Sequence, residues 1–360
     1  MSFWSNKKVF VTGHTGFKGA WLVKMLIRRG SRVFGYALGQ PSEPCIYGES
    51  EELKNIPQVI GDIRSGHELT SSLCAFKPDV VLHLAAQALV RDSYRDPVGT
   101  FETNVMGTVN LFEAVRKLGS DVSLVNVTSD KCYDNKEWIW GYRESEAMGG
   151  KDPYSASKGC SELVTSSYRH SYFKFGGVRL ASARAGNVFG GGDWATDRLI
   201  PDIIRSFNQN QAVTIRSPQS IRPWQFVLEP ISGYLRLAEK NYLEPGFDQG
   251  WNFGPSDVDT KSVMWMAKAV AKRWGKDATI RVDSSKDHPK EACLLRLDST
   301  KARSILGWSP VLDLETSLDW TVDFYKNFYT GSMSIDALMN DQVEKYLDLV
   351  GKKNDSMSLL

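Results

Sequence analysis

The chain has 360 residues, of which 42% are hydrophobic and 24% charged, values typical of a globular protein with one large domain or two modest ones. The 44 basic and 42 acidic residues leave a formal net charge of +2, and the basic residues are spread out, which excludes the electrostatic footprint of a nucleic-acid-binding protein. No apolar run approaches the roughly 18 residues that a membrane-spanning helix needs, and the start MSFWSNKKVFVTG lacks the apolar core of a signal peptide.

The first half of the chain alternates strand and helix patterns. Short, continuously apolar or β-branched runs predict strands at 9–13, 32–38, 57–63, 79–86, 123–129 and 177–186. Between them, amphipathic patterns predict helices at 17–29, 65–76, 97–119 and 152–173. Strands of this kind alternating with helices indicate an α/β fold of the Rossmann type, a doubly wound parallel sheet with both faces covered.

The pattern changes after residue 186. A glycine-rich stretch, GNVFGGGDW (186–194), is followed by shorter elements, among them an amphipathic helix in TKSVMWMAKAVAKRW (260–274). We therefore expect a Rossmann domain over 1–186 and a smaller mixed α/β domain over 187–360. Segments near 221–256 are expected to rejoin the main sheet, and the last residues, 351–360, to fray.

The cysteines bear on location and metal binding. All five, at positions 45, 74, 132, 160 and 293, are scattered without the spacing of a disulfide framework or of a metal site. This usage predicts reduced thiols in a cytoplasmic protein without a bound metal.

The first predicted strand ends in a glycine turn, TGHTGFKG (12–19), with the spacing G-x-x-G-x-x-G. Such a turn lets the backbone approach a pyrophosphate while the next helix presents its N-terminus to the charge. The acid that usually holds the ribose 2′-hydroxyl at the end of the second strand is absent from 33–41, so we expect the adenosine to be bound weakly. His14 and Lys18 either donate to a phosphate or ribose or lie on the solvated surface. Asp62 is a candidate acceptor for the adenine amine.

A tyrosine and a lysine stand four positions apart in YSASK (154–158), which places Tyr154 and Lys158 on one face of a helix. A nearby ammonium favours the phenolate, so we expect Lys158 to lower the pKa of Tyr154. Tyr154 would then act as the general base for a sugar hydroxyl while hydride leaves the same carbon, with Ser129 orienting that hydroxyl. The spacing alone often arises by chance; it gains weight from the glycine turn and the strand-end serine.

With these motifs the chain resembles the extended short-chain dehydrogenases/reductases that act on nucleotide sugars, nearly from end to end. Further shared segments are LAAQ (84–87), NVMGTVNLFEA (104–114), RAGNVFGGGDW (184–194) and LDSTKARSILGWSP (297–310). The GGGDW loop and RPWQFV (222–227) narrow the resemblance to the 4,6-dehydratase branch that acts on CDP-glucose. The resemblance implies NAD as the cofactor, CDP-glucose as the substrate and a role in deoxysugar biosynthesis for O-antigen or lipopolysaccharide.

The resemblance also implies the residues of the two binding sites. The 1–186 domain would bind NAD through Gly13, His14, Gly16, Phe17, Lys18, Gly19, Asp62, Ile63, Leu84, Ala85, Ala86, Gln87, Asn104, Tyr154 and Lys158. The 187–360 domain would hold the nucleotide sugar, and the substrate contacts would be Gln87, Val90, Ser93, Ser129, Asn187, Asp193, Trp194, Arg198 and Arg222.

A nucleotide sugar carries a pyrophosphate, which an arginine binds well. Arg222 is the first candidate, and Arg198 and Arg216 are either further candidates or solvated surface charges. His288 and Glu291 either touch the nucleotide or lie on a surface loop.

The adjacent pair Asp130-Lys131 separates a dehydratase from its relatives. After oxidation at C4, such an enzyme must remove the C5 proton, expel the 6-hydroxyl and return hydride to C6. The resemblance assigns Asp130 as the acid at the 6-hydroxyl and Lys131 as the base at C5; alternatively Lys131 stays charged and stabilises the enolate. Neighbouring side chains of a regular strand point to opposite faces, so both can reach one substrate only if the chain turns there.

Two other functions fit the fold. A nucleotide-sugar 4-epimerase would leave Asp130-Lys131 idle, and a non-enzymatic dinucleotide sensor would have no need of the tyrosine and lysine. In many members of the family that this chain resembles, the helices equivalent to 97–118 and 153–175 form a four-helix interface between two subunits. Because both have apolar residues on more than one side, we expect a homodimer.

Overall fold

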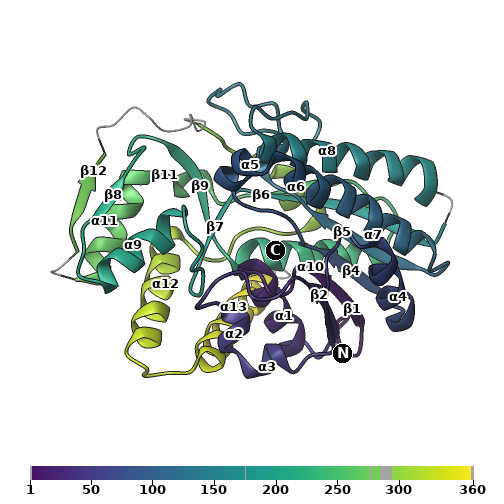
Figure 1. Ribbon diagram of the computed structural model, residues 1–360, viewed down its shortest axis with the longest axis horizontal. Coiled ribbons are helices and arrows are strands. Elements are labelled where there is room, and N and C mark those ends of the chain that lie inside the picture. Colours follow the sequence, from purple (N-terminus) through teal and green to yellow (C-terminus); the bar gives the residue numbers. More distant parts are fainter. Residues whose placement is uncertain (1, 175, 276–277, 284–293, 358–360) are drawn as a thin grey trace.

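The computed structural model describes residues 2–174, 176–275, 278–283 and 294–357 (Figure 1). At its centre lies a seven-stranded sheet, entirely parallel, with strand order β10-β6-β5-β4-β1-β2-β3. Its strands are β1 (Lys8–Thr12), β2 (Arg32–Ala37), β3 (Gln58–Ile60), β4 (Val80–His83), β5 (Val122–Val127), β6 (Val178–Ala185) and β10 (Gly250–Phe253). The order reverses between β1 and β4, so the predicted doubly wound Rossmann-type sheet is confirmed.

Helices cover both faces of this sheet because strand side chains alternate. Val9 and Val11 enter one buried cluster, and Phe10 between them enters the other. The first face is covered by α1 (Phe17–Arg28) and α10 (Leu228–Leu243), and the second by α4 (Gly66–Phe76), α7 (Gly107–Arg116) and α8 (Pro153–Tyr168). The described residues contain no helix that is both long and apolar enough to cross a membrane.

Two predicted helices are interrupted by π-helical turns. The helix expected over 97–119 is α6 (Pro97–Phe101), η1 (Glu102–Met106) and α7, and the helix expected over 152–173 is α8 followed by η3 (Arg169–Phe173). Asp152 caps α8 by accepting from the Ser155 backbone N–H, as its position before a proline suggests. The short helices α2 (Ile46–Glu49), α3 (Glu51–Lys54) and α5 (Val90–Arg95) were not predicted, because they are too short for a periodic signal.

Smaller sheets follow β6. A three-stranded sheet has the order β11-β9-β7 and a two-stranded sheet pairs β12 with β8. These elements are β7 (Asn187–Phe189), β8 (Val213–Ile215), β9 (Ile221–Phe226), β11 (Thr260–Ser262) and β12 (Ile280–Val282), with helices α9 (Leu199–Asn208), α11 (Val263–Trp274) and α12 (Leu314–Tyr329) and the short turns η4 (Asp257–Asp259) and η5 (Ala302–Leu306). Within the segment near 221–256, α10 and β10 lie on the central sheet, whereas β9 belongs to the three-stranded one.

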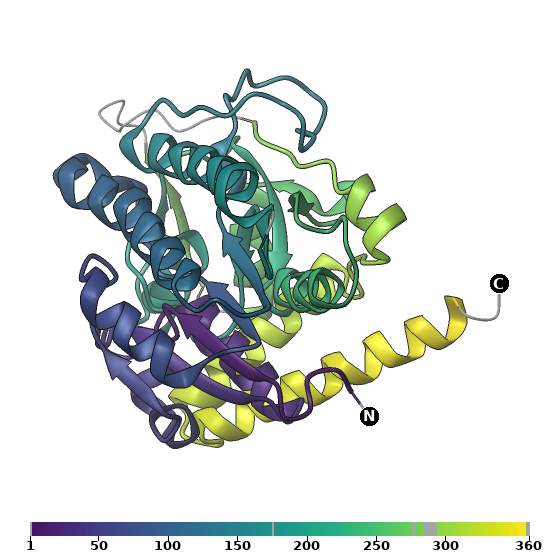
Figure 2. The same cartoon turned by 90° about the vertical axis from the view of Figure 1, so that its right-hand side faces the viewer.

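The chain ends in the long helix α13 (Ile335–Met357), which packs against α1 and runs out beyond the N-terminal segment (Figure 2). The expectation that residues from 351 onwards fray is therefore wrong as far as Met357. His288 and Glu291, considered above for the nucleotide, and Cys293 lie outside the described residues.

A buried carboxylate ties α13 to the core. Glu229 on α10 is 1% exposed, and its Oε1 accepts from the backbone N–H groups of Val311 (2.9 Å) and Leu312 (2.7 Å). Its Oε2 accepts from the Tyr346 hydroxyl of α13 at 2.8 Å. Burial raises the pKa of Glu229 from 4.5 to about 7, against the opposing effect of these hydrogen bonds.

We expect this carboxylate to make the protein less stable as the pH rises from about 4.5 to about 7. The native state holds the proton more tightly than the unfolded chain, so the stabilisation is complete below the unfolded pKa and lost as the pH passes the native pKa. A difference of about 2.5 pKa units corresponds to about 3 kcal/mol. Urea unfolding at about pH 5 and about pH 8 should show a smaller pH effect on the free energy of unfolding for Glu229→Gln than for wild type. Equal pH effects would contradict this.

Candidate active site

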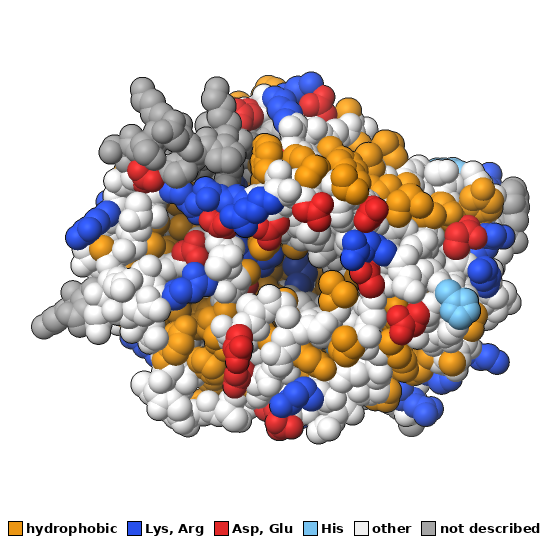
Figure 3. Space-filling view, viewed as in Figure 1, with side chains coloured by type: hydrophobic (Ala, Val, Ile, Leu, Met, Phe, Trp, Pro, Cys, Tyr) orange, Lys and Arg blue, Asp and Glu red, His pale blue; other side chains and the backbone are white. Residues whose placement is uncertain are grey.

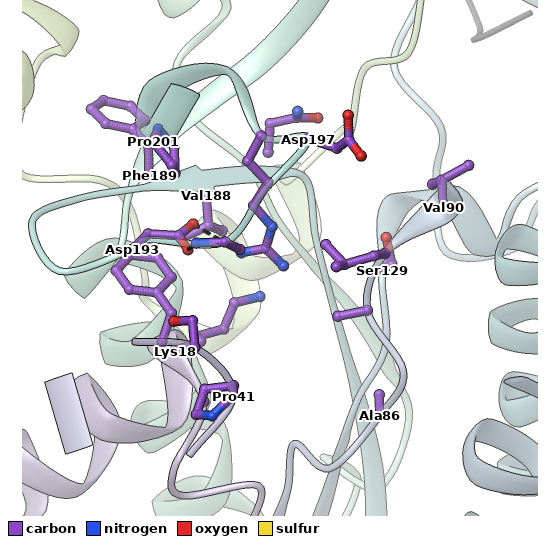
Figure 4. Close-up of a pocket in the computed structure, with 18 of the residues that line it drawn as sticks. Lys18, Pro41, Ala86, Val90, Ser129, Val188, Phe189, Asp193, Asp197 and Pro201 are labelled. Atoms are coloured by element: carbon purple, nitrogen blue, oxygen red, sulfur yellow. Dashed lines mark hydrogen bonds and ion pairs between the residues drawn. The ribbon is translucent and has the colours of Figure 1, made fainter. Parts of the chain in front are cut away.

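A pocket of about 740 Å³ opens at the carboxyl ends of the central strands, where parallel α/β sheets bind their ligands. Figure 3 shows the hollow near the middle of one face, with basic side chains inside it. In Figure 4, Lys18 of the glycine turn extends between Ser129 on one wall and Asp193 on the other.

The glycine turn lines the pocket and fits a pyrophosphate. Gly13 has φ +75°, and a Cβ there would lie 2.6 Å from the Ala85 backbone nitrogen; a Cβ on Gly19 would lie 2.0 Å from the Gly13 carbonyl oxygen. Gly16 is the N-cap of α1, and among the described residues neither a capping side chain nor an acid occupies this first turn. The free N–H groups of α1 therefore face the pocket and favour an anion.

The structure separates the two polar side chains of this turn. Lys18 is half-buried in the pocket wall, and burial lowers its pKa to about 7, with Arg198 and Lys158 adding to the effect. His14 is 1% exposed, and its Nε2 hydrogen-bonds Gln58 Oε1 at 2.7 Å. Its ring faces β2 and β3 rather than the pocket that the described residues form. The predicted contact of the His14 side chain with phosphate or ribose is incompatible with this placement.

The other end of the pocket would receive an adenosine. The loop after β2 lines it with residues 38–42, 45 and 46, which contain no acid. Asp62 and Ile63 line it from the end of β3. The Asp62 carboxylate accepts from Arg64 Nε (2.8 Å) and Nη2 (2.6 Å), which lowers the pKa of Asp62 and occupies part of its accepting capacity.

Three predicted contact residues lie behind the pocket wall. Asn104 accepts from the Gln87 backbone N–H at 2.8 Å and donates to the Ser157 hydroxyl at 2.8 Å, while the Gln87 side chain bonds its own loop. Ser93 accepts from the Tyr154 backbone N–H at 3.1 Å. These residues shape the loop and the start of α8. The predicted neighbours Leu84, Ala85, Ala86 and Val90 do line the pocket.

The predicted catalytic side chains converge at the end of β5. The strand ends at Val127 and the chain turns into the 3₁₀ helix η2 (Asp130–Cys132), so the expected turn is confirmed. The Ser129 hydroxyl donates to Asp130 Oδ1 at 2.9 Å and accepts from the Lys131 backbone N–H at 3.2 Å. Lys131 Nζ lies 5.9 Å from the centre of the Tyr154 ring. Helix α8 brings Tyr154 and Lys158 to the same pocket.

Burial controls the protonation of the tyrosine and lysine. It raises the pKa of Tyr154 to about 12, with hydrogen bonding to Ser129 and the charge of Arg198 opposing it. Burial lowers the pKa of Lys158 to about 8, with the charge of Glu162 opposing it. The predicted lowering of the Tyr154 pKa is therefore wrong, because desolvation of the phenolate outweighs the Ser129 hydrogen bond and the charge of Arg198.

Asp130 has the environment of a proton donor. It is 2% exposed, and burial raises its pKa while Lys131, Ser129 and Arg222 oppose the shift. Its Oδ2 is buried without a hydrogen-bond partner among the described residues and faces Gly186. A carboxyl group in this setting holds its proton more readily than an exposed one.

The opposite wall carries the remaining predicted substrate residues, Asn187, Asp193, Trp194, Arg198 and Arg222. Arg198 Nη1 pairs with Asp193 Oδ2 at 2.9 Å, which raises the pKa of Arg198. Trp194 is 8% exposed and donates through Nε1 to the Tyr329 hydroxyl at 3.1 Å, so its indole is packed into the wall of the pocket. Arg222 on β9 is 6% exposed and reaches the pocket beside Asp130.

An ion-pair bridge at the pocket was not predicted. Asp197 Oδ1 lies 3.3 Å from Arg91 Nη1 of α5 and 3.1 Å from Arg216 Nη1, and all three residues line the pocket. Figure 4 places Asp197 across from Val90 at the start of α5. No local pattern marks this bridge, because its members are far apart in sequence. Within the described ranges, no three His, Cys, Asp or Glu side chains gather as a metal site requires.

Comparison with known proteins places these features in context. Residues 10–321 match the family described as GDP-mannose 4,6 dehydratase. The CDP-glucose 4,6-dehydratase of Salmonella typhimurium is 53% identical over 337 residues, which cover 92% of this chain and 93% of the relative.

Two solved structures share the fold. The UDP-glucose 4-epimerase of Thermus thermophilus, in complex with NAD, aligns with a TM-score of 0.77 at 25% identity over 89% of this chain and 99% of its own. The dTDP-glucose 4,6-dehydratase of Streptomyces venezuelae, with NAD bound, aligns with a TM-score of 0.76 at 22% identity over 89% of this chain and 97% of its own.

The glycine turn yields a prediction for dinucleotide binding. Gly19→Ala would force a Cβ to within 2.0 Å of the Gly13 carbonyl oxygen, so the turn must open. We expect the affinity for NAD, measured by fluorescence titration, to fall by about tenfold or more, in line with about 1.4 kcal/mol per decade. Gly351→Ala in α13, where nothing lies within 4 Å, is the control and should bind NAD as wild type does. Equal affinities for Gly19→Ala and the control would refute the assignment.

Proposed function

This chain belongs to the GDP-mannose 4,6-dehydratase family, and from that premise we propose that it converts CDP-glucose to CDP-4-dehydro-6-deoxyglucose and water, as an NAD-dependent hydro-lyase of deoxysugar biosynthesis. The observation that carries the proposal is the buried Asp130 beside Ser129 and Tyr154. A 4-epimerase needs no acid at that position, whereas a dehydratase needs a proton donor for the departing hydroxyl.

The cofactor is NAD, which accepts a hydride from C4 of the sugar and returns it to C6 when bound. The residues that would hold it are the glycine turn from Gly13 to Gly19, Asp62 and Ile63, and the loop from Leu84 to Ala86. The turn at the start of α1 fits the pyrophosphate. Lys18 adds a half-buried ammonium on the same side.

Each catalytic side chain has one proposed task. Ser129 and Tyr154 hydrogen-bond the 4-hydroxyl, and the phenolate form of Tyr154 takes its proton as the ketone forms. Because burial raises the pKa of Tyr154 to about 12, this phenolate depends on the positive charge that Lys158 supplies beside it. Asp130, whose pKa burial raises, gives a proton to the 6-hydroxyl. Lys131 either removes the C5 proton or stabilises the enolate that this step creates. C5 takes up a proton again when C6 receives its hydride, so that the net change is the loss of one water. Because no net oxidation occurs, NAD is recovered after every turnover.

The wall opposite the cofactor would hold the nucleotide. Arg222 is our choice for the pyrophosphate, since it is buried beside Asp130 and offers a planar set of donors. Arg198 and Arg216 already pair with Asp193 and Asp197. Asn187 also lines the pocket, and we propose that it contacts the sugar or a phosphate. We propose that residues 1–186, together with α10 and β10, form the NAD-binding domain. Most of 187–360 would form the domain that binds the nucleotide sugar.

The direct test is to incubate the protein with CDP-glucose, with and without added NAD, and to weigh the product by mass spectrometry. A product lighter by one water, without accumulated NADH, is the expected result. A requirement for added NAD would follow from the missing acid after β2. An unchanged mass under both conditions would overturn the proposal for this substrate.

Asp130→Asn separates a dehydratase from an epimerase. Asn cannot supply the proton for the 6-hydroxyl, so we expect product formation to fall by about 10²-fold or more, the usual contribution of a general acid. Transient NADH, which reports oxidation at C4, should still form. Asp134→Asn, which changes a carboxylate paired with Lys136 away from the pocket lining, is the matched control and should retain its activity. An unimpaired Asp130→Asn enzyme would contradict the role.

We also propose that the protein is a cytoplasmic homodimer. Large apolar side chains are exposed along α5, α6, η1, α8 and η3, namely Tyr94, Val98, Phe101, Met106, Leu163 and Tyr172. Figure 3 shows hydrophobic side chains gathered over this part of the molecule. A contiguous apolar face of this kind indicates a protein contact, and the helix pair supports a second copy. The unpaired cysteines among the described residues support a reducing compartment.

Leu163→Glu tests the dimer. Leu163 is 60% exposed on α8, so a carboxylate there is harmless in a monomer but buried and unpaired in a dimer of these helices. We expect light scattering to give twice the mass of one chain for wild type and the mass of one chain for the variant. Val258→Glu, at a position in η4 that is 71% exposed, is the control and should leave the mass unchanged. A Leu163→Glu variant with the wild-type mass would exclude this interface.

A further inference from the structure

A buried ion pair lies directly behind the catalytic turn. Glu162 of α8 and Arg184 of β6 join through Oε2 and Nη2 at 2.8 Å, with side chains only 4% and 6% exposed. Neither residue lines the pocket that the described residues form. Burying two charges in this way does not by itself stabilise a fold over an apolar pair, so the pair calls for another explanation.

Glu162 holds the start of the turn. Its Oε1 accepts from the hydroxyl of Thr128, the residue before Ser129, and its Oε2 accepts from the Ser182 hydroxyl at 2.8 Å as well as from Arg184. Both carboxylate oxygens are therefore hydrogen-bonded, and the position of Glu162 is fixed by Thr128, directly after β5, and by Ser182 and Arg184 of β6.

Arg184 holds the end of the same turn. Its Nη1 donates to the Tyr133 hydroxyl at 2.7 Å and to the Glu144 carbonyl at 3.1 Å. Tyr133 follows η2 and donates in turn to Asn252 Oδ1 at 2.8 Å. The ion pair therefore hydrogen-bonds to the residues that flank the catalytic turn, Glu162 to Thr128 before it and Arg184 to Tyr133 after it.

The helix side of this contact carries the other catalytic residues. Glu162 stands four positions after Lys158 and eight after Tyr154, which places all three on one face of α8. The helix also meets the turn closely at Gly159, where a Cβ would lie 3.2 Å from the Cys132 carbonyl oxygen. A shift of α8 along the turn would therefore move Tyr154 relative to Ser129.

We propose that Glu162 and Arg184 are positioning residues, which set α8 against the turn 128–133 so that Tyr154 and Ser129 meet on one sugar hydroxyl. The inference rests on the proposed function, because it assigns these residues to the oxidation step at C4. The negative charge of Glu162 also opposes the effect of burial on the pKa of Lys158. Replacing Glu162 and Arg184 removes both effects and leaves every side chain that lines the pocket unchanged.

Thr128→Val tests the geometric part with the least disturbance. Valine keeps the shape but removes the hydrogen bond to Glu162. We expect kcat for CDP-glucose to fall by about tenfold or more, with KM within about twofold, because misplacing a reacting group acts on the transition state. Enzyme-bound NADH should appear more slowly by the same factor in a single turnover.

Thr165→Val is the matched control. Thr165 is equally buried on α8 and accepts from Asn126 Nδ2 at 2.8 Å, but it does not touch the turn. This variant should keep the wild-type kcat. Wild-type kcat in Thr128→Val, or an equal loss in both variants, would overturn the inference.

The ion pair itself is tested by the double variant Glu162→Gln/Arg184→Met, which removes both charges together and leaves neither buried alone. We expect a thermal midpoint close to that of wild type but a kcat reduced by about 10²-fold, with KM nearly unchanged. A folded double variant with wild-type kcat would overturn the inference. Wild-type protein that forms no product would overturn the proposed function instead, so the two failures are distinct.

Discussion

The active site depends on the contact between helix α8 and the end of strand β5. Strand β5 delivers Ser129, Asp130 and Lys131, and the helix delivers Tyr154 and Lys158. Neither element alone contains a complete set of reacting groups. The buried carboxylate of Glu162 on the helix accepts hydrogen bonds from Thr128, directly after β5, and from Ser182 and Arg184 of β6. Charged hydrogen bonds, and not apolar packing alone, therefore define how the helix lies against the turn.

Desolvation gives the pocket its chemistry. Burial favours the neutral form of every acid and base, so it raises the pKa of Asp130 and lowers those of Lys158 and Lys18. The pocket thereby holds an acid that keeps its proton more readily than in water, beside lysines that release theirs more easily. A solved epimerase and a solved dehydratase share this fold, so the fold alone does not decide the reaction.

Much of the fold and site was readable from local patterns. The six predicted strands and the predicted helices are present because apolar periodicity and caps are local signals, and β10 adds the seventh strand from a distant segment. The long helices α10, α12 and α13 were not predicted. The glycine turn, Ser129, Asp130, Tyr154 and Lys158 all reach the pocket because each sits at a strand end or the start of a helix, where topology brings them together. The short helices and the π turns carry no such pattern.

The sequence by itself determined which residues stand at the carboxyl edge of the sheet, because the ends of the strands can be recognised from the periodicity along the chain and all strands of a parallel sheet end at the same edge. Only the tertiary structure decided where neighbouring side chains point: Lys18 enters the pocket, whereas His14, in the same turn, is buried against Gln58. It also decided the pKa of Tyr154, since burial depends on every element packed around the phenol. The bridge at Asp197 and the Glu162–Arg184 pair join residues far apart in sequence, and such contacts exist only once the chain has folded.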